Sequence, residues 1–385
     1  MKIPFNKPFI VGKELYYIAK AVLDGHISGD GPYTKRCHRW LEERLGSPQA
    51  LLTHSCTAAL EMAALLCDIQ PGDEVILPSY TFVSTANAFV LRGGIPVFVD
   101  IRPDTLNLDE KLIEAAITPR TKAIVPVHYA GVPCEMDAIM EIARRHELLV
   151  VEDAAQALLS SYQGRALGSI GHFGCLSFHE TKNVISGEGG ALLVNDSTFI
   201  KRAEIVREKG TNRSQFFRGQ VDKYTWVEPG SSYLPSEIIG AFLYAQLENA
   251  EQIIAARKKI CRLYVERLSF LEEAGRLRLP SVEAGNGHMF YLLLASLEER
   301  TRLIEHLKAS DILSVFHYVP LHSSPAGIKL GRVSGNMAVT DSVAERLLRL
   351  PLYYEMGEAE VDRVVECVAS FFEAGTVGTY PKNKG

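Results

Sequence analysis

The sequence predicts an α/β fold, in which a large domain is built around a mostly parallel sheet of seven strands and a smaller α+β domain follows at the C-terminal end. Between about residues 48 and 195, short apolar runs alternate with helix-period segments, which is typical of a parallel sheet covered by helices. A long polar stretch then breaks the pattern before a further helical segment. The 385 residues, at roughly 100 to 200 per domain, favour two domains.

The seven expected strands are short apolar runs, as in strands buried on both faces of a sheet. In sheets of this kind ligands bind beyond the carboxyl ends of the strands, so the residues directly after these runs are the first candidates for a site. The runs are 50–53, 74–78, 96–100, 123–127, 148–153, 173–178 and 191–194.

A second domain is expected after the polar stretch. From Ser236 onwards apolar residues recur at helical spacing, which indicates a long helix that bridges into the smaller domain. Residues 289–294 and 313–319 are its strand candidates. We therefore divide the chain into a large domain, 1–245, and a small domain, 246–385, and expect that the N-terminal segment can pack on the small domain.

Composition excludes several classes of function. The net charge is −5 with acids and bases interspersed, so the chain offers no basic field for nucleic acid. The first residues carry charges and a proline where a signal peptide needs an apolar core, and no membrane-spanning apolar stretch occurs, so we expect a cytoplasmic protein. The seven cysteines are scattered without a CxxC pair, which argues against disulfides and structural zinc.

A possible phosphate site lies at the start of the Ala-rich segment 55–66. Ser55 and Thr57 place hydroxyl groups next to the first backbone N–H groups of the expected helix, and such a helix start can bind phosphate. The alternative is that these residues only cap the helix.

Two charged residues follow strand ends. Asp153 ends the run 148–153, where a carboxylate can stay ionised beside a cation such as a pyridinium nitrogen; alternatively it caps the next helix. Lys182 lies five residues beyond Ser177. A partly desolvated lysine there is an imine-forming nucleophile, because desolvation lowers the pKa of its amine; alternatively it is a solvated surface residue.

Other candidates are aromatic or basic. Tyr80 and Phe82 follow a strand and could lie flat on an aromatic ring, or pack in the core. His317 and His322 are five residues apart around a proline, which is not the spacing of a helical zinc site, so we expect no metal. Four cations of the long polar stretch could meet a diphosphate or stay solvated: Lys209, Arg213, Arg218 and Lys223.

The order of these features resembles one enzyme family. The strings EDAAQ (152–156), SFHETKN (177–183) and GEGG (187–190) are similar to those of the DegT-type sugar aminotransferases, which are fold-type I pyridoxal-phosphate enzymes. The resemblance extends over almost the whole chain. It implies pyridoxal 5′-phosphate as cofactor, a nucleotide sugar and L-glutamate as substrates, and a homodimer with shared active sites.

The resemblance also implies roles for individual residues. Lys182 would form the Schiff base with the cofactor and move the proton during catalysis. Asp153 would pair with the ring nitrogen, Gln156 would approach the ring hydroxyl, and Phe82 would stack on the ring. Three residues would hold the phosphate, namely Thr57, Ala58 and Ser177. Four further residues are our own candidates for substrate contacts and are not implied by the resemblance: Arg213 and Arg218 at the diphosphate, with His317 and His322.

The chain departs from the family at one position. Many members carry an Asn-Tyr-Arg string where a partner subunit completes the phosphate site, but here the string is Ser232, Tyr233, Leu234. Two other readings stay open: amination of another sugar or another sugar carbon, and a catalytically inactive regulator that kept the fold. A dehydratase relative of the family has histidine in place of the lysine, whereas Lys182 is present here.

Overall fold

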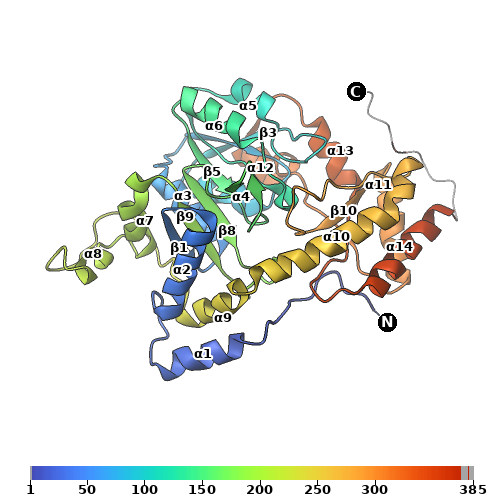
Figure 1. Cartoon of the computed structure of the whole chain (residues 1–385). Helices are drawn as coiled ribbons and strands as arrows, with labels where there is room; N and C mark the ends of the chain where they lie inside the picture. The colour runs from blue at the N-terminus through green and yellow to red at the C-terminus, as the bar shows by residue number, and fades with distance from the viewer. Residues whose placement is uncertain (1, 374–379, 381–385) are drawn as a thin grey trace.

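The computed structural model describes residues 2–373 and 380, and its largest element is an eight-stranded sheet (Figure 1). The order across the sheet is β1-β9-β8-β5-β4-β2-β3-β12. The strands are β1 (Gln49–Thr53), β2 (Glu74–Pro78), β3 (Ile95–Val99), β4 (Thr121–Ile124), β5 (Leu149–Asp153), β8 (Phe173–Ser177), β9 (Gly190–Val194) and β12 (Arg332–Val333).

The predicted mostly parallel sheet is confirmed. Each of the seven expected runs forms a strand, and among them only β9 runs antiparallel to its neighbours β1 and β8. The eighth strand, β12, has two residues and pairs in parallel with β3 at the sheet edge. It was missed because so short a segment has no periodicity of its own and forms only against β3.

Helices cover both faces of the sheet, so successive strand residues enter different cores. In β1, Leu51 joins the core beneath α3, whereas Ala50 and Leu52 join the core that contains α2 and α9. This burial on both faces explains the uninterrupted apolar runs of the sequence. The helices of this part are α1 (Glu14–Leu23), α2 (Pro32–Leu45), α3 (Cys56–Leu66), α4 (Val83–Val90), α5 (Glu110–Ala116), α6 (Met136–Arg145), α7 (Ile200–Arg207) and α9 (Glu237–Leu247).

A long helix, α10 (Ala250–Glu273), leads from α9 to a second core (Figure 1). There a three-stranded antiparallel sheet has the order β10-β13-β11. The expected helix from Ser236 is confirmed as α9, with the Ser236 hydroxyl accepting from the Ile239 N–H. The remaining elements are β10 (Phe290–Leu293), α11 (Leu297–Ala309), β11 (Val315–Phe316), α12 (Pro325–Leu330), α13 (Ala338–Arg346), β13 (Leu347–Leu350) and α14 (Glu358–Glu373).

The strand candidates of the small domain had different outcomes. Residues 289–294 form β10, but only two residues of 313–319 form a strand, because Tyr318 turns the backbone to a φ of 37°. A bulky side chain at positive φ is incompatible with a continuing strand. The central strand β13 was not predicted.

Two segments cross the predicted boundary at residues 245 and 246. Strand β12 belongs to the late part of the chain yet joins the large sheet. In the other direction, Ile3 donates to the Asp311 carbonyl at 2.9 Å and is buried in the core of α10 and α14. The N-terminal segment thus packs on the small domain, and the division itself stays a prediction.

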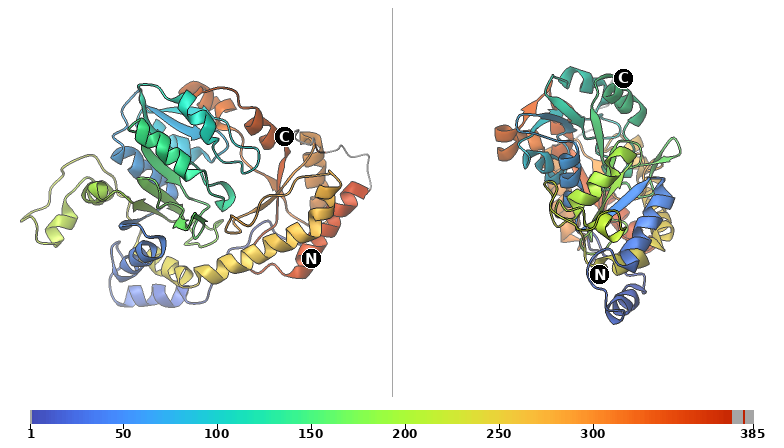
Figure 2. Two further views of the ribbon diagram at one scale, coloured as in Figure 1. Left: turned by 45° about the horizontal axis from the view of Figure 1, so that its top comes forward. Right: turned by 90° about the vertical axis from the view of Figure 1, so that its left-hand side faces the viewer.

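The polar stretch 209–235, called the arm below, projects from the body of the molecule and carries the short helix α8 (Arg213–Phe217) (Figures 1 and 2). Its two sides are joined by a bridge between Thr211 and Trp226. Several aromatic side chains of the arm are exposed, among them Phe217 at 69% and Trp226 at 75%. Within the described part of the chain, no helix is long and apolar enough to cross a bilayer.

Candidate active site

A cavity of about 600 Å³ lies where the ends of β5 and β8 meet loops of the small domain. It brings together most of the predicted site residues from segments far apart in the sequence. Those that line it are Thr57, Phe82, Asp153, Gln156, Ser177, Lys182 and His317.

The helix start at α3 forms one wall of this cavity. Ser55 caps the helix by accepting from the Ala58 N–H at 3.0 Å, so the capping interpretation is confirmed and the Ala58 N–H is already engaged. Ser55, Cys56 and Thr57 still line the cavity. The first backbone N–H groups of a helix have no acceptor within the helix itself, so a ligand can accept from those that are not capped. A Cβ at Gly190 would collide with the backbone of Ser55 and Cys56, so this glycine is needed where β9 passes the helix start.

Asp153 is held at the end of β5 with 6% of its surface exposed. Its Oδ2 accepts from the Thr85 hydroxyl at 2.7 Å and its Oδ1 from the Ala155 N–H at 3.1 Å. The alternative that Asp153 caps a helix is excluded, because β5 is followed by turns and the short strand β6 (Ser161–Tyr162). A fixed, buried carboxylate at this place suits a cationic group of a ligand.

Lys182 lines the same cavity, and burial lowers the pKa of its amine below the usual 10.5. The neighbouring Cys56 and Asp153 act against this shift, and Arg349 adds to it. The alternative of a freely solvated surface lysine does not fit this environment. A lowered pKa increases the share of neutral amine, which is the nucleophilic form.

A hydrogen-bonded pair joins the two sides of the cavity. Gln156 donates through Nε2 to the Tyr318 hydroxyl at 2.9 Å and accepts at Oε1 from the Ala130 N–H at 2.7 Å. Phe82 is 57% exposed at the start of α4, with its ring centroid 6.5 Å from that of Tyr318. The amide of Gln156 is therefore oriented before any ligand binds, and Phe82 has an open ring face at the cavity.

His317 is part of a buried aromatic group. Its ring stacks on Tyr318 with centroids 3.6 Å apart, and its Nδ1 lies 2.7 Å from the Tyr129 hydroxyl. Burial lowers the pKa of His317 well below 6.5, and the cations Arg349 and Lys182 add to this effect. The imidazole is therefore neutral near pH 7. Tyr80 is also in this group and is 1% exposed, so core packing is its actual role.

The other predicted substrate residues lie elsewhere in this protomer. His322 does not line the 600 Å³ cavity; its ring bonds to Ser79 at 2.7 Å and faces Asp341 at 3.3 Å. Arg213 and Arg218 line a separate cavity of about 760 Å³ at the base of the arm. Both are paired with carboxylates, Arg213 with Glu208 and Arg218 with Glu204. Within one chain they therefore do not meet Lys182.

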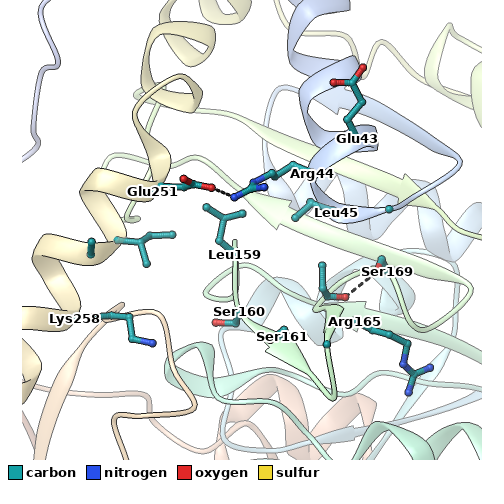
Figure 3. Close-up of a pocket in the computed structure, with 15 residues that line it drawn as sticks. Glu43, Arg44, Leu45, Leu159, Ser160, Ser161, Arg165, Ser169, Glu251 and Lys258 are labelled. Atoms are coloured by element: carbon teal, nitrogen blue, oxygen red, sulfur yellow. Dashed lines mark hydrogen bonds and ion pairs between the residues drawn. The ribbon is translucent and has the colours of Figure 1, made fainter.

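A further cavity, of about 820 Å³, opens on the surface between α2, α10 and the hairpin formed by β6 and β7 (Arg165–Ala166) (Figure 3). Two of its arginines already have acidic partners, Arg44 with Glu251 and Arg165 with Asp137. None of the predicted site residues lines it. Although it is larger, it lacks the convergent reactive groups of the cavity around Lys182.

The sequence reasoning missed several residues of the Lys182 cavity. Tyr318 and Arg349 line it, and Tyr129 supports His317 from behind. Tyr318 lies within the HYVPLH string, but nothing in its spacing marked it. Arg349 lies on β13, which was itself not expected to be a strand.

Comparison with known proteins decides the family. A sequence model described as the DegT/DnrJ/EryC1/StrS aminotransferase family matches residues 10–369. The chain belongs to this family. It is therefore an aminotransferase, and its cofactor is pyridoxal phosphate.

This chain is similar to named relatives and to solved structures along nearly its full length. GDP-perosamine synthase from Caulobacter vibrioides is 34% identical over 371 residues, 94% of this chain and 96% of the relative. The spore coat polysaccharide biosynthesis protein SpsC from Bacillus subtilis is also 34% identical, over 95% and 96%. The PLP form of Spr1654 from Streptococcus pneumoniae superposes with a TM-score of 0.89 at 28% identity, covering 97% and 99%.

The residues present fit this cofactor. The α3 start with Thr57 and the nearby Ser177 offer donors for a phosphate, and Asp153 offers a fixed carboxylate for a ring nitrogen. Lys182 offers an amine whose pKa burial lowers. The phosphate, the ring nitrogen and the aldehyde of pyridoxal phosphate thus each have a matching group on the cavity wall.

Proposed function

We propose that this aminotransferase transfers the amino group of L-glutamate to C4 of dTDP-4-keto-6-deoxy-D-glucose, giving dTDP-4-amino-4,6-dideoxy-D-galactose for surface polysaccharide biosynthesis. The observation that carries the reaction is the half-buried Lys182 amine, which lines one cavity with Asp153. The sugar rests on sequence strings: residues 78–94, 207–226 and 317–322 resemble those of dTDP-4-amino-4,6-dideoxygalactose transaminase. That enzyme contributes to enterobacterial common antigen.

In this proposal each residue has a defined task. The cofactor, when bound, supplies an electron sink that stabilises negative charge on the carbon that loses its proton. Asp153, whose position Thr85 fixes, would pair with the ring nitrogen, and a carboxylate there would favour the protonated nitrogen. Lys182 would hold the cofactor through Nζ, and its amine would carry the proton of the donor carbon. A lowered pKa increases the share of neutral amine, which is the form that can accept that proton.

The remaining residues position the ring. Phe82 stacks on it and Gln156 approaches its hydroxyl, which the fixed orientation of the amide supports. Thr57 and Ser177 would hold the phosphate, and the Ala58 N–H would contribute only if it exchanged its bond to the Ser55 hydroxyl for one to the phosphate. His317 is neutral and buried beside the cavity, so we assign it a hydrogen bond to the sugar rather than a charge contact.

Nucleotide sugars are the substrate class that the relatives support. GDP-perosamine synthase and a UDP-4-amino-4-deoxy-L-arabinose–oxoglutarate aminotransferase from Shewanella sediminis, 31% identical over 95% of this chain, are named for GDP- and UDP-linked sugars. The second name also includes oxoglutarate, the keto acid that corresponds to glutamate. Both agree with the proposed donor and with a sugar attached to a nucleotide.

An absorbance titration tests both half-reactions. Purified protein with pyridoxal phosphate should show the band of the lysine-bound cofactor, which glutamate should bleach and dTDP-4-keto-6-deoxyglucose should restore. Lys182→Ala should show no such band and no turnover. A band that bleaches with glutamate but never returns would remove the proposed sugar while leaving the aminotransferase activity.

Two alternatives are separated by simple measurements. Amination at C3, or of another nucleotide sugar, would appear in the NMR spectrum of the product. An inactive regulator would bind the cofactor without transferring an amino group to any keto sugar; the intact Lys182 and Asp153 argue against it.

We further propose a homodimer in which the arm of one chain completes the site of the other. The arm projects from the body of the chain (Figure 2) and carries exposed aromatic residues such as Phe217 and Trp226. Arg213 and Arg218 would then meet the diphosphate bound by the partner. Ser232 stands where many relatives have the asparagine that reaches the partner's phosphate site.

Subunit mixing tests the shared site. Lys182→Ala and the double charge reversal Arg213→Glu, Arg218→Glu should each be inactive as homodimers. A mixed dimer has one site with both an intact lysine and an intact partner arm, so activity should return towards about a quarter of the wild-type value for random assortment. Light scattering that shows a monomer, or mixing without recovery, would contradict the shared site.

A further inference from the structure

One cation of the active-site cavity has no counter-charge in the described part of the chain. Arg349 lines the cavity, its Nε makes no hydrogen bond, and no described carboxylate forms an ion pair with it. Burial lowers the pKa of its guanidinium. Buried arginines normally meet carboxylates or carbonyl oxygens, because an unpaired buried charge is costly.

The other charged groups of the cavity wall are already engaged. Arg257 donates to the carbonyls of Gly287 and His288, each at 2.9 Å. Asp153 is held by Thr85, and Glu188 faces His179 at 3.7 Å. Of the two described arginines that line this cavity, Arg349 is the one whose side chain makes no hydrogen bond or ion pair to the described part of the chain.

The position of Arg349 is rigid. It lies on β13, the central strand of the three-stranded sheet, opposite Tyr291 on one side and Val315 on the other. Its guanidinium carbon lies 4.8 Å from the ring centroid of Phe5, a cation–π contact that only partly offsets the missing anion. A guanidinium held in this way is suited to bind a planar anion through two parallel hydrogen bonds.

We propose that Arg349 binds a carboxylate of the amino donor and so selects an acidic amino acid for the first half-reaction. This inference rests on the proposed function and deepens it. In an amino acid the α-carboxylate is one bond from the carbon that carries the amine, so its anchor must lie near Lys182. Arg349 meets this requirement, since it lines the same cavity as Lys182.

Other anions fit this position less well. In a nucleotide sugar the hexose ring separates the diphosphate from the reacting carbon, so the diphosphate belongs farther from Lys182. The cofactor phosphate has the α3 start and Ser177 on the cavity wall. When the keto sugar replaces the donor, the guanidinium can donate to sugar hydroxyl oxygens instead.

The test measures binding of two probes to the holoenzyme by calorimetry: glutarate, an unreactive dicarboxylate, and dTDP. For Arg349→Gln we expect glutarate to bind roughly 10- to 100-fold more weakly, the usual loss for a charge-assisted hydrogen-bonded pair. Its dTDP affinity should stay within about twofold. Arg349→Lys should recover part of the glutarate affinity, because it restores the charge without the planar fork. Arg346→Gln, on the last turn of α13 and outside the cavity wall, is the matched control.

A stability measurement separates ligand binding from a structural role. Arg349→Met removes a buried unpaired charge and keeps the apolar stem, so its melting temperature without donor should equal or exceed that of the wild type. If the Arg349 variants melt at lower temperatures and lose affinity for glutarate and dTDP to the same extent, Arg349 is structural and the proposal is overturned. Unchanged glutarate affinity would overturn it as well, and so would a loss confined to dTDP.

Failure of the proposed function is visible separately. Binding of the cofactor to Lys182 does not require Arg349, so the band of the lysine-bound cofactor should form in the wild type and in every Arg349 variant. Its absence from the wild type would refute the role of Lys182 and not that of Arg349. If glutamate bleaches the wild-type band and an Arg349→Gln band at the same concentrations, the aminotransferase stands and only the donor assignment falls.

Discussion

Gln156 and Tyr318 are joined by a hydrogen bond of 2.9 Å that connects the large sheet to the small domain across the active-site cavity. The amide is held at its other end by the Ala130 N–H. Both polar atoms of this buried amide therefore have partners in the described chain. The predicted contact of Gln156 with the cofactor ring depends on this fixed orientation.

Tyr318→Phe tests the connection. The variant keeps the ring but leaves Nε2 of Gln156 without an acceptor, so we expect the free energy of unfolding to fall by about 1 kcal/mol. The affinity for pyridoxal phosphate should fall as well, since the amide is less well oriented. Urea unfolding and a cofactor titration measure the two effects. Tyr354→Phe, at a tyrosine whose ring stacks on Phe9, is the control and should retain cofactor affinity.

The pKa of Lys182 predicts a pH dependence of stability. Burial lowers this pKa in the folded apoenzyme below 10.5, so between the two values the unfolded chain binds more protons at this site than the folded chain. The contribution of Lys182 to the free energy of unfolding therefore rises with pH across that window, and is least favourable below the folded pKa, where the buried amine is charged.

The measurement compares wild type with Lys182→Met by denaturant unfolding of the apoenzyme from neutral pH towards 10.5. The variant should be the more stable protein at the lower end, and its advantage should shrink as the pH rises. Lys201→Met, at an exposed position of α7, should show no such trend. A constant difference across the range would mean that the Lys182 amine is not buried.

Asp153→Asn should reduce kcat by roughly 100-fold or more, because a neutral amide cannot hold a positive charge on the ring nitrogen. Thr85→Val removes only the hydroxyl that bonds to Oδ2, so a smaller loss is expected. Asp24→Asn, at the exposed end of α1, should leave kcat unchanged. Initial rates with saturating glutamate and keto sugar measure all three. Equal rates for Asp153→Asn and wild type would remove Asp153 from the cofactor site.

The sequence was informative where the structure depends on local patterns. The seven strands were recognisable because burial on both faces demands apolar runs, and Asp153, Ser177 and Lys182 were recognisable because they follow such runs. The helix start with Thr57 was recognisable from its capping residues and small side chains. Each signal lies within a few neighbouring residues.

Contacts between distant segments were not predictable in this way. Strand β13 is the clearest example, because its LLRL pattern directly follows α13 and continues its mixed apolar and charged character. Arg349 reaches Lys182 only through the packing of the two domains. The orientation of Tyr318 depends on a backbone turn at φ 37°, which no side-chain pattern announces.

The contacts of His322 with distant segments were also not predictable from the sequence, and they indicate a structural role. Ser79 is fully buried, and its Oγ accepts from the backbone N–H of His322 at 3.0 Å. The Ser79 Oγ also lies 2.7 Å from Nδ1 of the ring, and Nε2 faces Asp341 at 3.3 Å. The three side chains join the end of β2 to α13.

His322→Ala would leave the buried Ser79 hydroxyl without its hydrogen-bond partner on the ring, at a cost of about 1 to 3 kcal/mol in the free energy of unfolding. The dissociation constant for dTDP should stay within about twofold of the wild-type value, because the ring lies outside the active-site cavity. Asp341→Asn keeps an acceptor for Nε2 and should cost less than His322→Ala. Weaker dTDP binding by His322→Ala without any loss of stability would return His322 to the substrate site, where the sequence alone had placed it.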